Sequence, residues 1–450
     1  MKFMIESWAS RIWWRRYLRR HAASWSELAE FPGKSPVEQR KVLVARLLEQ
    51  VRYFGNREDA LPEWREAARI REPDELWRAW PSLPIVTREM LRSRFDPREI
   101  QSRFQLRGDV DATGGSTGEP TRFFHDTEMS RRRTAARVYA QMCMGWRPGM
   151  ATVIVWGSER DIMRSLHWKR RLGSRLLRQF LVGGYKLDRK TVETVVGLVL
   201  RHRPAAVYGF TSMLEFVARE VSQGPPLPKG CVHTAWCGGE MLFPEQSALF
   251  KRAFGVPILN HYGGRELSTM ACQFEEGGPL HVFRPWLFCE LVDDNGKRVG
   301  PGETGKLLWT STVCRGTPFL RYEVGDLAVF DTSGENESGV FALHRLEGRV
   351  ASVLELPNGK RMNNLFWNHL FKGFPEIHQF QVLVKCDGSL EIRLTGQGFA
   401  PSRQTECHTI VRNFLGGVPF EFRWVDRIPL TAQGKLLQVV RESPATPTEN

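Results

Sequence analysis

The sequence predicts an α/β protein: a large N-terminal domain with parallel or mixed sheets flanked by helices, followed by a small α+β domain. Two observations lead to this fold class. Between residues 151 and 264, apolar runs of strand length alternate with helical segments, as in a parallel sheet with right-handed crossovers. The chain has 450 residues, more than one hydrophobic core usually serves, so two or more domains are expected.

The N-terminal part of the chain, residues 1–60, is expected to be helical. Within it, Arg11–Arg20 combines arginines with aromatic side chains. The favoured interpretation is a helix that buries Trp8, Ile12 and Trp14 against the domain and leaves its arginines in solvent. The alternative is a basic amphipathic helix lying on an anionic membrane surface.

Hydrophobic patterning places the elements of the large domain. Ala151–Trp156 is a continuous apolar run that ends at Gly157, as a buried parallel strand would. The basic segment 164–178 is expected to be a solvated face. Helices are predicted at Val42–Phe54, Thr127–Met144, Ser212–Val221 and Pro244–Phe254, and strands at Ala151–Trp156, Ala205–Tyr208, Cys231–Cys237 and Val256–Leu259.

Two short polar segments follow successive strands of this sheet. Gly238-Gly239-Glu240 comes after one strand, and Tyr262–Glu266 comes after the next. In open parallel sheets, ligands bind beyond the carboxyl ends of the strands. Each segment offers small residues that allow close approach and one carboxylate. We therefore expect a ligand site at this edge of the sheet.

A third segment, Asp111–Thr121, is rich in glycine and hydroxyl residues. Consecutive backbone N–H groups in such a turn can form an anion-binding nest, and the hydroxyls add donors. The segment is not a Walker A loop, because no Gly-Lys-Ser/Thr follows, and it lacks the Gly-x-Gly-x-x-Gly spacing of dinucleotide folds. It is a candidate phosphate loop.

Charge and composition narrow the classes of partner. Lys and Arg number 64 against 50 Asp and Glu, and the net charge of +14 favours anionic ligands such as nucleotides, coenzyme A or acidic membrane. The arginines are scattered and no nucleic-acid-binding motif accompanies them, so no nucleic-acid partner is expected. Without a secretory apolar region, a membrane-spanning run or a disulfide scaffold among its eight cysteines, the chain is expected to be cytoplasmic and reduced.

The order of the residues in these segments adds a resemblance. Thr-Gly-Gly-Ser-Thr-Gly-Glu-Pro-Thr at 113–121 closely resembles the phosphate loop of the adenylate-forming (AMP-binding) superfamily, in the form used by phenylacetate–CoA ligases and related capsule-biosynthesis (CapK-like) proteins. The resemblance spans residues 76–440. Further matching segments follow in the family's order at Gly238–Glu240, Tyr262–Glu266, Gly302–Thr310, Arg321–Leu327, Leu346–Arg349 and Pro429–Lys435.

The resemblance implies three parts. Residues 1–75 would be a helical segment packed on the large domain, 76–346 the nucleotide- and acid-binding large domain, and 347–450 a C-terminal lid domain. Strands are predicted in the lid at 377–384 and 390–394, with a hairpin turn at Asp387-Gly388 between them.

The resemblance also implies the chemistry: ATP with Mg²⁺ converts a carboxylic acid to acyl-AMP and releases pyrophosphate. Lys435, Glu266 and Arg349 would be catalytic, with Glu266 binding Mg²⁺ and Asp326 binding the ribose. The family usually has acidic pivot residues just after Arg349, but Ala351 and Ser352 stand here. Nucleotide-binding residues would be Thr113, Gly114, Gly115, Ser116, Thr117, Gly118, Thr121, Gly238, Gly239, Glu240, Tyr262, Gly263, Arg265, Asp326 and Arg349.

Several readings stay open at this point. The acyl acceptor is coenzyme A or an amine, and a homodimer is left open. The absence of the usual acidic pivot residues, where Ala351 and Ser352 stand, leaves open a non-catalytic nucleotide-binding scaffold. Lys435, Glu266 and Asp326 are nevertheless all present. Cys272, His281 and Cys314, with Cys289 as a fourth, are candidate ligands of a structural zinc, which some phenylacetate–CoA ligase relatives carry in this region; the alternative is buried cysteines without a metal.

Overall fold

The computed structural model describes residues 2–113, 121–156, 174, 177–183, 188–336, 338–349, 354–355, 361–362, 367, 370–371, 374, 376–429 and 436–442. The chain divides into two compact units. The first contains Met1–Val324, Ala328–Leu346 and Ala432–Gly434, and the second contains Gly325–Leu327, Glu347–Thr431 and Lys435–Asn450.

The first unit begins with helices, as expected for residues 1–60. These are α1 (Lys2–Glu30), the 3₁₀ turn η1 (Phe31–Gly33) and α2 (Pro36–Gly55). Ser35 and Glu38 form a reciprocal capping box that starts α2. Four shorter helices and a 3₁₀ turn follow: α3 (Pro62–Ala67), α4 (Pro73–Ala79), η2 (Trp80–Ser82), α5 (Arg88–Arg94) and α6 (Pro97–Arg103).

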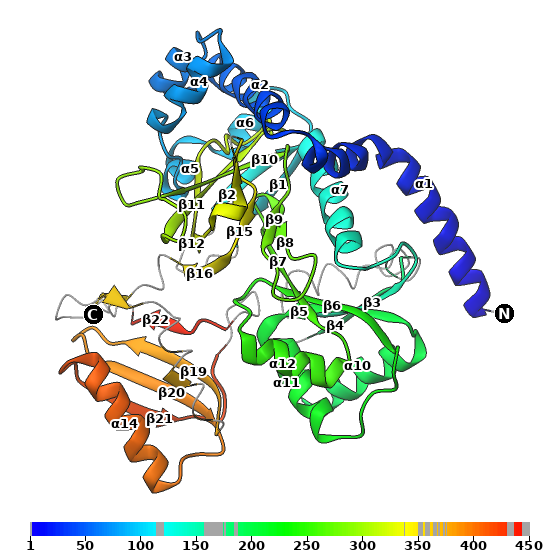
Figure 1. Cartoon of the computed structure of the whole chain (residues 1–450), viewed down its shortest axis with the longest axis vertical. Helices are drawn as coiled ribbons and strands as arrows, with labels where there is room; N and C mark the ends of the chain where they lie inside the picture. The colour runs from blue at the N-terminus through cyan, green and yellow to red at the C-terminus, as the bar shows by residue number, and fades with distance from the viewer. Residues whose placement is uncertain are drawn as a thin grey trace, which may run out of the picture. The chain divides into compact units, whose positions relative to one another are not determined.

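Helix α1 packs on the large unit along one side. It runs beside α7 (Thr127–Cys143), as Figure 1 shows. Trp14 is only 3% exposed, and the Trp25 indole donates a hydrogen bond to the carbonyl of Ala135 on α7 at 3.0 Å. The packed interpretation of this helix is therefore confirmed at Trp14, but it is wrong at Ile12, which is exposed on the outer side.

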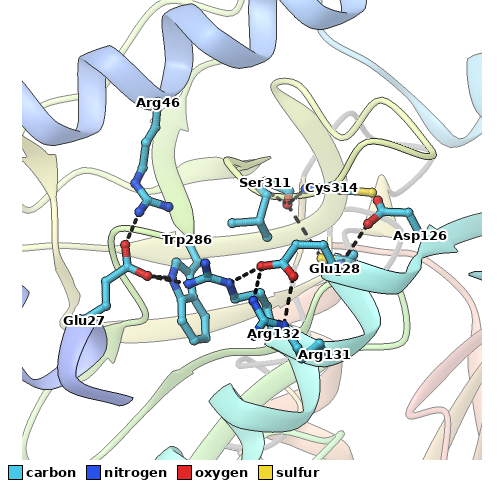
Figure 2. Close-up of polar contacts among 11 residues, drawn as sticks. Glu27, Arg46, Asp126, Glu128, Arg131, Arg132, Trp286, Ser311 and Cys314 are labelled. Carbon is cyan, nitrogen blue, oxygen red and sulfur yellow. Dashed lines mark hydrogen bonds and ion pairs between the residues drawn. The ribbon is translucent and has the colours of Figure 1, made fainter. Parts of the chain in front are cut away.

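The N-terminal helices are tied to the large unit by one ionic network, which Figure 2 shows. Glu27 of α1 accepts from Arg46 of α2, from Arg132 of α7 and, at 2.7 Å, from the indole of Trp286. Arg132 also binds Glu128 one turn earlier on α7. These side chains are partly buried, so the first helices are an integral part of the unit and not a tail.

An eight-stranded mixed sheet forms the centre of the unit, in the order β15-β9-β8-β7-β6-β5-β3-β4. Strands β4, β3, β5, β6 and β7 are parallel, which confirms the predicted crossovers. The strands are β3 (Ala151–Trp156), β4 (Gln179–Gly183), β5 (Ala205–Phe210), β6 (Val232–Gly238), β7 (Ile258–Gly264), β8 (Ser268–Cys272), β9 (Leu280–Val282) and β15 (Ala342–Leu343).

Helices α10 (Arg189–Arg201), α11 (Thr211–Gln223) and α12 (Pro244–Phe254) lie together on one side of the parallel strands (Figure 1). The residues that alternate toward one face, including Val153, Val207 and Ala235, are fully buried. On β5 the neighbouring Ala206, which points to the opposite face, is fully buried as well, and strands buried on both faces read as nearly continuous apolar runs.

Strand β7 is longer than the sequence predicted. Its parallel pairing with β6 ends at Gly238 and His261, and the strand then continues to Gly264 in an antiparallel pair with β8. A Cβ atom on Gly263 would lie 2.2 Å from the Ser268 carbonyl oxygen, so glycine permits this close pairing. The expected loop after the strand is therefore a tight hairpin that carries Arg265 and Glu266.

A second sheet and a hairpin complete the first unit. The six-stranded sheet has the order β13-β14-β10-β11-β12-β16, and β1 and β2 form a separate antiparallel pair. The strands are β1 (Gly108–Ala112), β2 (Arg122–Asp126), β10 (Leu287–Val292), β11 (Gly305–Ser311), β12 (Tyr322–Val329), β13 (Glu335–Asn336), β14 (Gly339–Val340) and β16 (Arg345–Arg349), with a 3₁₀ turn η3 (Thr332–Gly334).

The second unit is a small α+β structure. Its four-stranded sheet, in the order β21-β20-β19-β22, packs with α14 (Pro401–Leu415) around a core that includes Val382, Ile392 and Val411. The predicted hairpin is confirmed, because β19 and β20 pair antiparallel. The strands are β17 (Leu354–Glu355), β18 (Arg361–Met362), β19 (Ile377–Val384), β20 (Leu390–Gly396), β21 (Phe420–Trp424) and β22 (Val439–Arg441).

Within the part of the chain that the structure describes, no helix combines the length and apolarity that crossing a bilayer requires.

Candidate functional site

Part of the predicted site lies outside the described residues. This applies to Gly114–Gly118 of the phosphate loop, to Lys435, and to Ala351 and Ser352. Arg349 is the last residue of β16, and only its backbone is described. The remaining predicted residues can be followed to their partners.

Thr113 and Thr121 close the neck of the candidate phosphate loop. The Thr113 amide donates to the Thr121 carbonyl at 2.9 Å, and the Thr121 amide donates back to Thr113 Oγ1 at 3.0 Å. This pair extends the β1–β2 hairpin by one step beyond Ala112 and Arg122. The loop therefore leaves from, and returns to, a base held by two hydrogen bonds.

Strand β2 leads directly from that neck into α7. Asp126 ends the strand and caps the helix, since its Oδ1 accepts from the Met129 amide at 3.0 Å. Its Oδ2 accepts from the amides of Arg315 at 2.6 Å and Gly316 at 3.1 Å (Figure 2 shows Asp126 beside Cys314). One carboxylate thus joins the loop's exit strand to the segment after β11.

Glu266 is where two predicted segments, Tyr262–Glu266 and Arg321–Leu327, meet a third part of the chain. Its side chain is buried, and Oε1 accepts a hydrogen bond of 3.1 Å from the phenol of Tyr322. Arg88, from the segment before the phosphate loop, lies 3.7 Å from the same oxygen. Burial and the nearby Glu266 carboxylate raise the pKa of Tyr322, so its hydroxyl stays protonated and remains a donor.

The main chain of Glu266 is held from the opposite side by His125 and Arg133. His125 Nε2 lies 2.6 Å from the Glu266 carbonyl oxygen, and Arg133 Nη1 lies 2.5 Å from His125 Nδ1. Arg133 Nη2 also donates to the Arg265 carbonyl at 3.0 Å. Burial and the neighbouring Arg133 lower the pKa of His125 to about 3, so the imidazole is neutral at physiological pH.

Basic side chains dominate the surroundings of this turn. Arg265 lies 3.6 Å from Asp111, beside the neck of the phosphate loop. Arg137, one turn after Arg133 on α7, is exposed and close enough to help lower the pKa of the buried His261 to about 4, although burial is the larger cause. A neutral histidine among arginines leaves a local surplus of positive charge, which suits an anionic ligand.

The Gly238-Gly239-Glu240 segment differs from the Glu266 turn in the partners of its carboxylate. A Cβ on Gly238 would lie 2.5 Å from the His261 carbonyl oxygen, so glycine allows β6 and β7 to approach. The Glu240 carboxylate accepts from the Ser212 amide at 2.7 Å and from its hydroxyl at 3.0 Å. Glu240 therefore stabilises the first turn of α11.

Two residues of the Arg-Tyr-x-x-Gly-Asp-Leu segment have clear partners. Tyr322 binds Glu266, and Arg321 is buried, donating to Glu290 at 3.2 Å and to the carbonyls of Pro81 and Leu83 at 2.6 Å each. Arg321 thus anchors the chain that leads to Arg88. Asp326 lies on β12 after Gly325, which has a φ of 79°. Tyr262 is buried, 6.1 Å from the Trp309 ring.

The zinc expectation needs correction. Among the described residues, no group of three or more His, Cys, Asp or Glu side chains is placed to hold a metal ion. Cys272 and His281 do face each other across β8 and β9, but His281 stacks on Phe274 at 4.2 Å, and Cys314 is a buried free thiol. Cys289 is likewise a buried free thiol, so these residues serve as packing side chains.

Sequence reasoning did not single out His125, Arg133 or Arg88. His125 stands four residues after the neck of the phosphate loop, and Arg133 lies two turns further on, so their position beside the loop was a usable signal. Nothing in their spacing from Glu266, however, indicates that they meet it.

Comparisons with known proteins concern one segment of the chain and its fold. Residues 170–315 match the family model described as AMP-binding enzyme. A crystal structure of 2-hydroxyisobutyryl-CoA ligase in the postadenylation state is similar with a TM-score of 0.68 and 18% identity over 90% of each chain. No curated protein matches at the threshold applied.

Two further solved structures are similar over a shorter span. The amide bond synthetase McbA from Marinactinospora thermotolerans has a TM-score of 0.52 and 18% identity, covering 72% of this chain and 67% of that one. ATP-bound MatB from Rhodopseudomonas palustris has a TM-score of 0.53 and 15% identity, covering 72% of this chain and 65% of that one. At these identities the likeness concerns the fold, which is that of the adenylate-forming enzymes.

Proposed function

We propose that this chain, a member of the adenylate-forming superfamily by its AMP-binding segment and its fold, is an AMP-forming acid ligase. It activates a carboxylic acid with ATP to give acyl-AMP and pyrophosphate, and then transfers the acyl group to coenzyme A. The observation that carries the proposal is the convergence on Glu266 of Tyr322, Arg88 and the His125–Arg133 pair. The adjoining residue, Arg265, lies 3.6 Å from Asp111, next to the neck of the candidate phosphate loop.

Glu266 fits the metal role. It is a buried carboxylate at the ligand edge of the sheet, and one of its oxygens already faces a hydroxyl donor and an arginine. Mg²⁺ prefers oxygen ligands and is usually held by one or two carboxylates together with substrate phosphates. When bound, the metal would neutralise charge on the phosphate oxygens.

The chain's own residues supply binding and alignment in this proposal. Ser116–Thr121 would hold the β- and γ-phosphates, and Asp326 would accept hydrogen bonds from the ribose hydroxyls. Arg349 would bind ribose or phosphate. Gly238, Gly239, Tyr262 and Gly263 would allow the nucleotide to approach the sheet edge, and Arg265 would add positive charge near the α-phosphate.

Lys435 is proposed to act in the chemical step, because an ammonium group stabilises the charge that grows at the α-phosphate. Replacing Lys435 with alanine should lower kcat for pyrophosphate release by about 100–1,000-fold and change KM for ATP little. Pre-formed acyl-AMP should restore the second half-reaction. Full adenylation activity in Lys435→Ala would show that the superfamily mechanism does not apply to this chain.

The acyl acceptor has two candidates. The fold neighbours include coenzyme A ligases and an amide bond synthetase, so coenzyme A and an amine are both chemically consistent. The net charge of +14 favours coenzyme A, whose phosphates are anionic. Amide formation is the alternative, and a trapping assay with both acceptors separates them.

A pyrophosphate-exchange screen tests the whole proposal. Purified protein is incubated with ATP, Mg²⁺, labelled pyrophosphate and a panel of aryl, fatty and hydroxy acids. We expect acid-dependent exchange with one class of acid and none with Glu266→Gln. A protein that binds ATP but exchanges with no acid would favour the non-catalytic scaffold function.

Helix α1 supports a second, weaker partner, an anionic membrane surface. Its outer side exposes Arg15, Arg16 and Arg19, and it also exposes Ile12 and Trp13. Arginines beside apolar and aromatic side chains are typical of helices that lie at the lipid interface. The eight cysteines are free thiols, which fits the reducing cytoplasm, where such a surface would face the inner leaflet.

Vesicle sedimentation tests this contact. Intact protein should bind phosphatidylserine vesicles at low salt and be released at high salt. A variant with Arg15, Arg16 and Arg19 replaced by glutamine should lose the binding while keeping pyrophosphate release. If the intact protein ignores such vesicles at low salt, α1 serves only in packing.

A further inference from the structure

One arginine, Arg133, holds the hairpin between β7 and β8 through hydrogen bonds to its main chain. Arg133 on α7 donates directly to the Arg265 carbonyl at 3.0 Å and reaches the next carbonyl, that of Glu266, through the ring of His125. His125 is 1% exposed, and its ring packs beside Phe123 and Phe319. Two consecutive peptide units are thus fixed by one side chain and its relay.

The chemistry of the donors determines the direction of this relay. A guanidinium has donors only, so Arg133 can meet His125 Nδ1 only if that nitrogen accepts. The imidazole proton must then sit on Nε2, which donates to the Glu266 carbonyl at 2.6 Å. One tautomer of His125 therefore serves both partners. Loss of His125 would remove the hydrogen bond to Glu266, and loss of Arg133 would remove the donor at Nδ1 and the hydrogen bond to the Arg265 carbonyl.

We propose that Arg133 and His125 are positioning residues that aim the Glu266 carboxylate at the ion held with the triphosphate. This inference rests on the proposed function. His125 lies on β2, four residues after Thr121 at the neck of the phosphate loop, and Arg133 lies on the helix that β2 enters. The pair therefore fixes Glu266 relative to the same strand that carries the loop.

The two ends of Glu266 are held by different parts of the chain. Tyr322 and Arg88 contact its carboxylate, whereas His125 and Arg133 hold its main chain and that of Arg265. Removing the second set leaves the contacts of the carboxylate with Tyr322 and Arg88 in place, but it frees the peptide that orients it. The expected consequence is weaker use of Mg²⁺ and not a loss of the metal ligand.

Two pairs of variants test the proposal. His125→Phe keeps a ring in the buried space but removes both nitrogens, and His125→Gln retains a donor that can reach the Glu266 carbonyl. Arg133→Met removes the guanidinium, and Arg133→Lys keeps one charged donor. The measurements are the Mg²⁺ concentration that half-saturates ATP binding, by calorimetry, and kcat for pyrophosphate release.

We expect His125→Phe and Arg133→Met to raise the half-saturating Mg²⁺ concentration by about 10–100-fold, with kcat reduced and the metal-free affinity for ATP unchanged. The conservative variants should recover part of the loss. Arg131→Met is the matched control: it lies on the same helix, pairs with Glu128 in a solvated position, and should leave the Mg²⁺ dependence unchanged.

The outcomes separate the two claims. In the first outcome, wild-type protein binds Mg–ATP and exchanges pyrophosphate, and all four variants are folded and keep the wild-type Mg²⁺ dependence. The positioning role is then wrong, and the proposed function stands. If metal-free ATP affinity falls as much as Mg²⁺ dependence, the pair serves structure alone. Wild-type protein that binds no Mg–ATP overturns both.

Discussion

Glu240 and Glu266 occupy similar places in the sequence. Each follows small residues at the carboxyl end of a strand, and the two strands, β6 and β7, are parallel neighbours in the sheet. Their carboxylates are used differently. Glu240 binds the amide and hydroxyl of Ser212 at the start of α11, whereas Glu266 meets Tyr322, 56 residues away, and Arg88 from the N-terminal part.

The difference indicates which of the two carboxylates is built for chemistry. Binding an exposed backbone amide at a helix start is a stabilising task that many acceptors can perform. Placing a tyrosine and an arginine at one buried carboxylate, and a histidine relay at its main chain, costs desolvation and serves no helix. A site assembled from remote segments at such a cost points to a ligand, which in the proposed function is the metal-bound triphosphate.

The largest expected effect comes from Glu266→Gln. The amide keeps the size of the side chain but removes the negative charge that would hold Mg²⁺. We expect kcat for acid-dependent pyrophosphate release to fall by about 1,000-fold or more, roughly 4 kcal/mol, with unchanged thermal unfolding. Glu240→Gln is the matched control and should stay within a few-fold of wild type. Equal losses of kcat in Glu266→Gln and Glu240→Gln would show that the two carboxylates do not differ in function.

His261, in the middle of β7, extends the comparison to the pH dependence of stability. Its pKa is lowered to about 4 by burial and by Arg137. The folded state therefore binds fewer protons than the unfolded chain, whose histidine titrates near 6.5, so the stability contribution is complete above about pH 6.5 and lost as pH falls toward 4. At pH 4 the loss is roughly 3 kcal/mol at about 1.4 kcal/mol per pH unit.

Denaturant unfolding at pH 7 and at pH 4.5 measures this effect. Wild type should lose more stability on acidification than His261→Gln, which has no proton to gain at this position. The difference between the two proteins isolates His261 from the other titrating groups. Identical pH dependence in both would mean that the imidazole is solvated in the protein.

Tyr322→Phe tests the contact between Glu266 and a residue remote in the sequence. It removes the hydroxyl that donates to Glu266 Oε1 at 3.1 Å and leaves the buried ring in place. A hydrogen bond to a charged group contributes about 1.5–3 kcal/mol, so we expect kcat to fall by roughly 10–100-fold. Thermal unfolding provides the check on folding. A variant with wild-type turnover would show that the phenol only packs.

The smallest effect is expected at Glu240, whose carboxylate contacts the start of a nearby helix in the pair of contacts compared above. Glu240→Ala removes the acceptor of the Ser212 amide and hydroxyl, and loss of such a contact at a helix start typically costs about 1 kcal/mol of unfolding free energy. Ser212→Ala should cost no more, and the double variant should be less destabilised than the sum. A large loss of turnover in Glu240→Ala would instead assign this carboxylate to the ligand.

Much of the fold followed from local patterns. The predicted strand Ala151–Trp156 and helix Pro244–Phe254 have the same bounds in the structure, because a buried strand and a helix with proline in its first turn leave strong periodic signals. The end of β7 did not follow. Whether Gly263 and Gly264 turn or extend depends on β8 arriving beside them, and the local sequence does not contain that partner.

By itself, the sequence determined which segments carry the candidate chemistry, since the order of small residues, hydroxyls and carboxylates is a local property. Only the tertiary structure decided how each residue is used. It joined Glu266 to Tyr322 and to the His125–Arg133 pair, engaged Glu240 at α11, and left Cys272 and His281 without further metal ligands among the described residues. The physical reason is that hydrogen bonds and ion pairs depend on distances that the folded chain sets between remote segments.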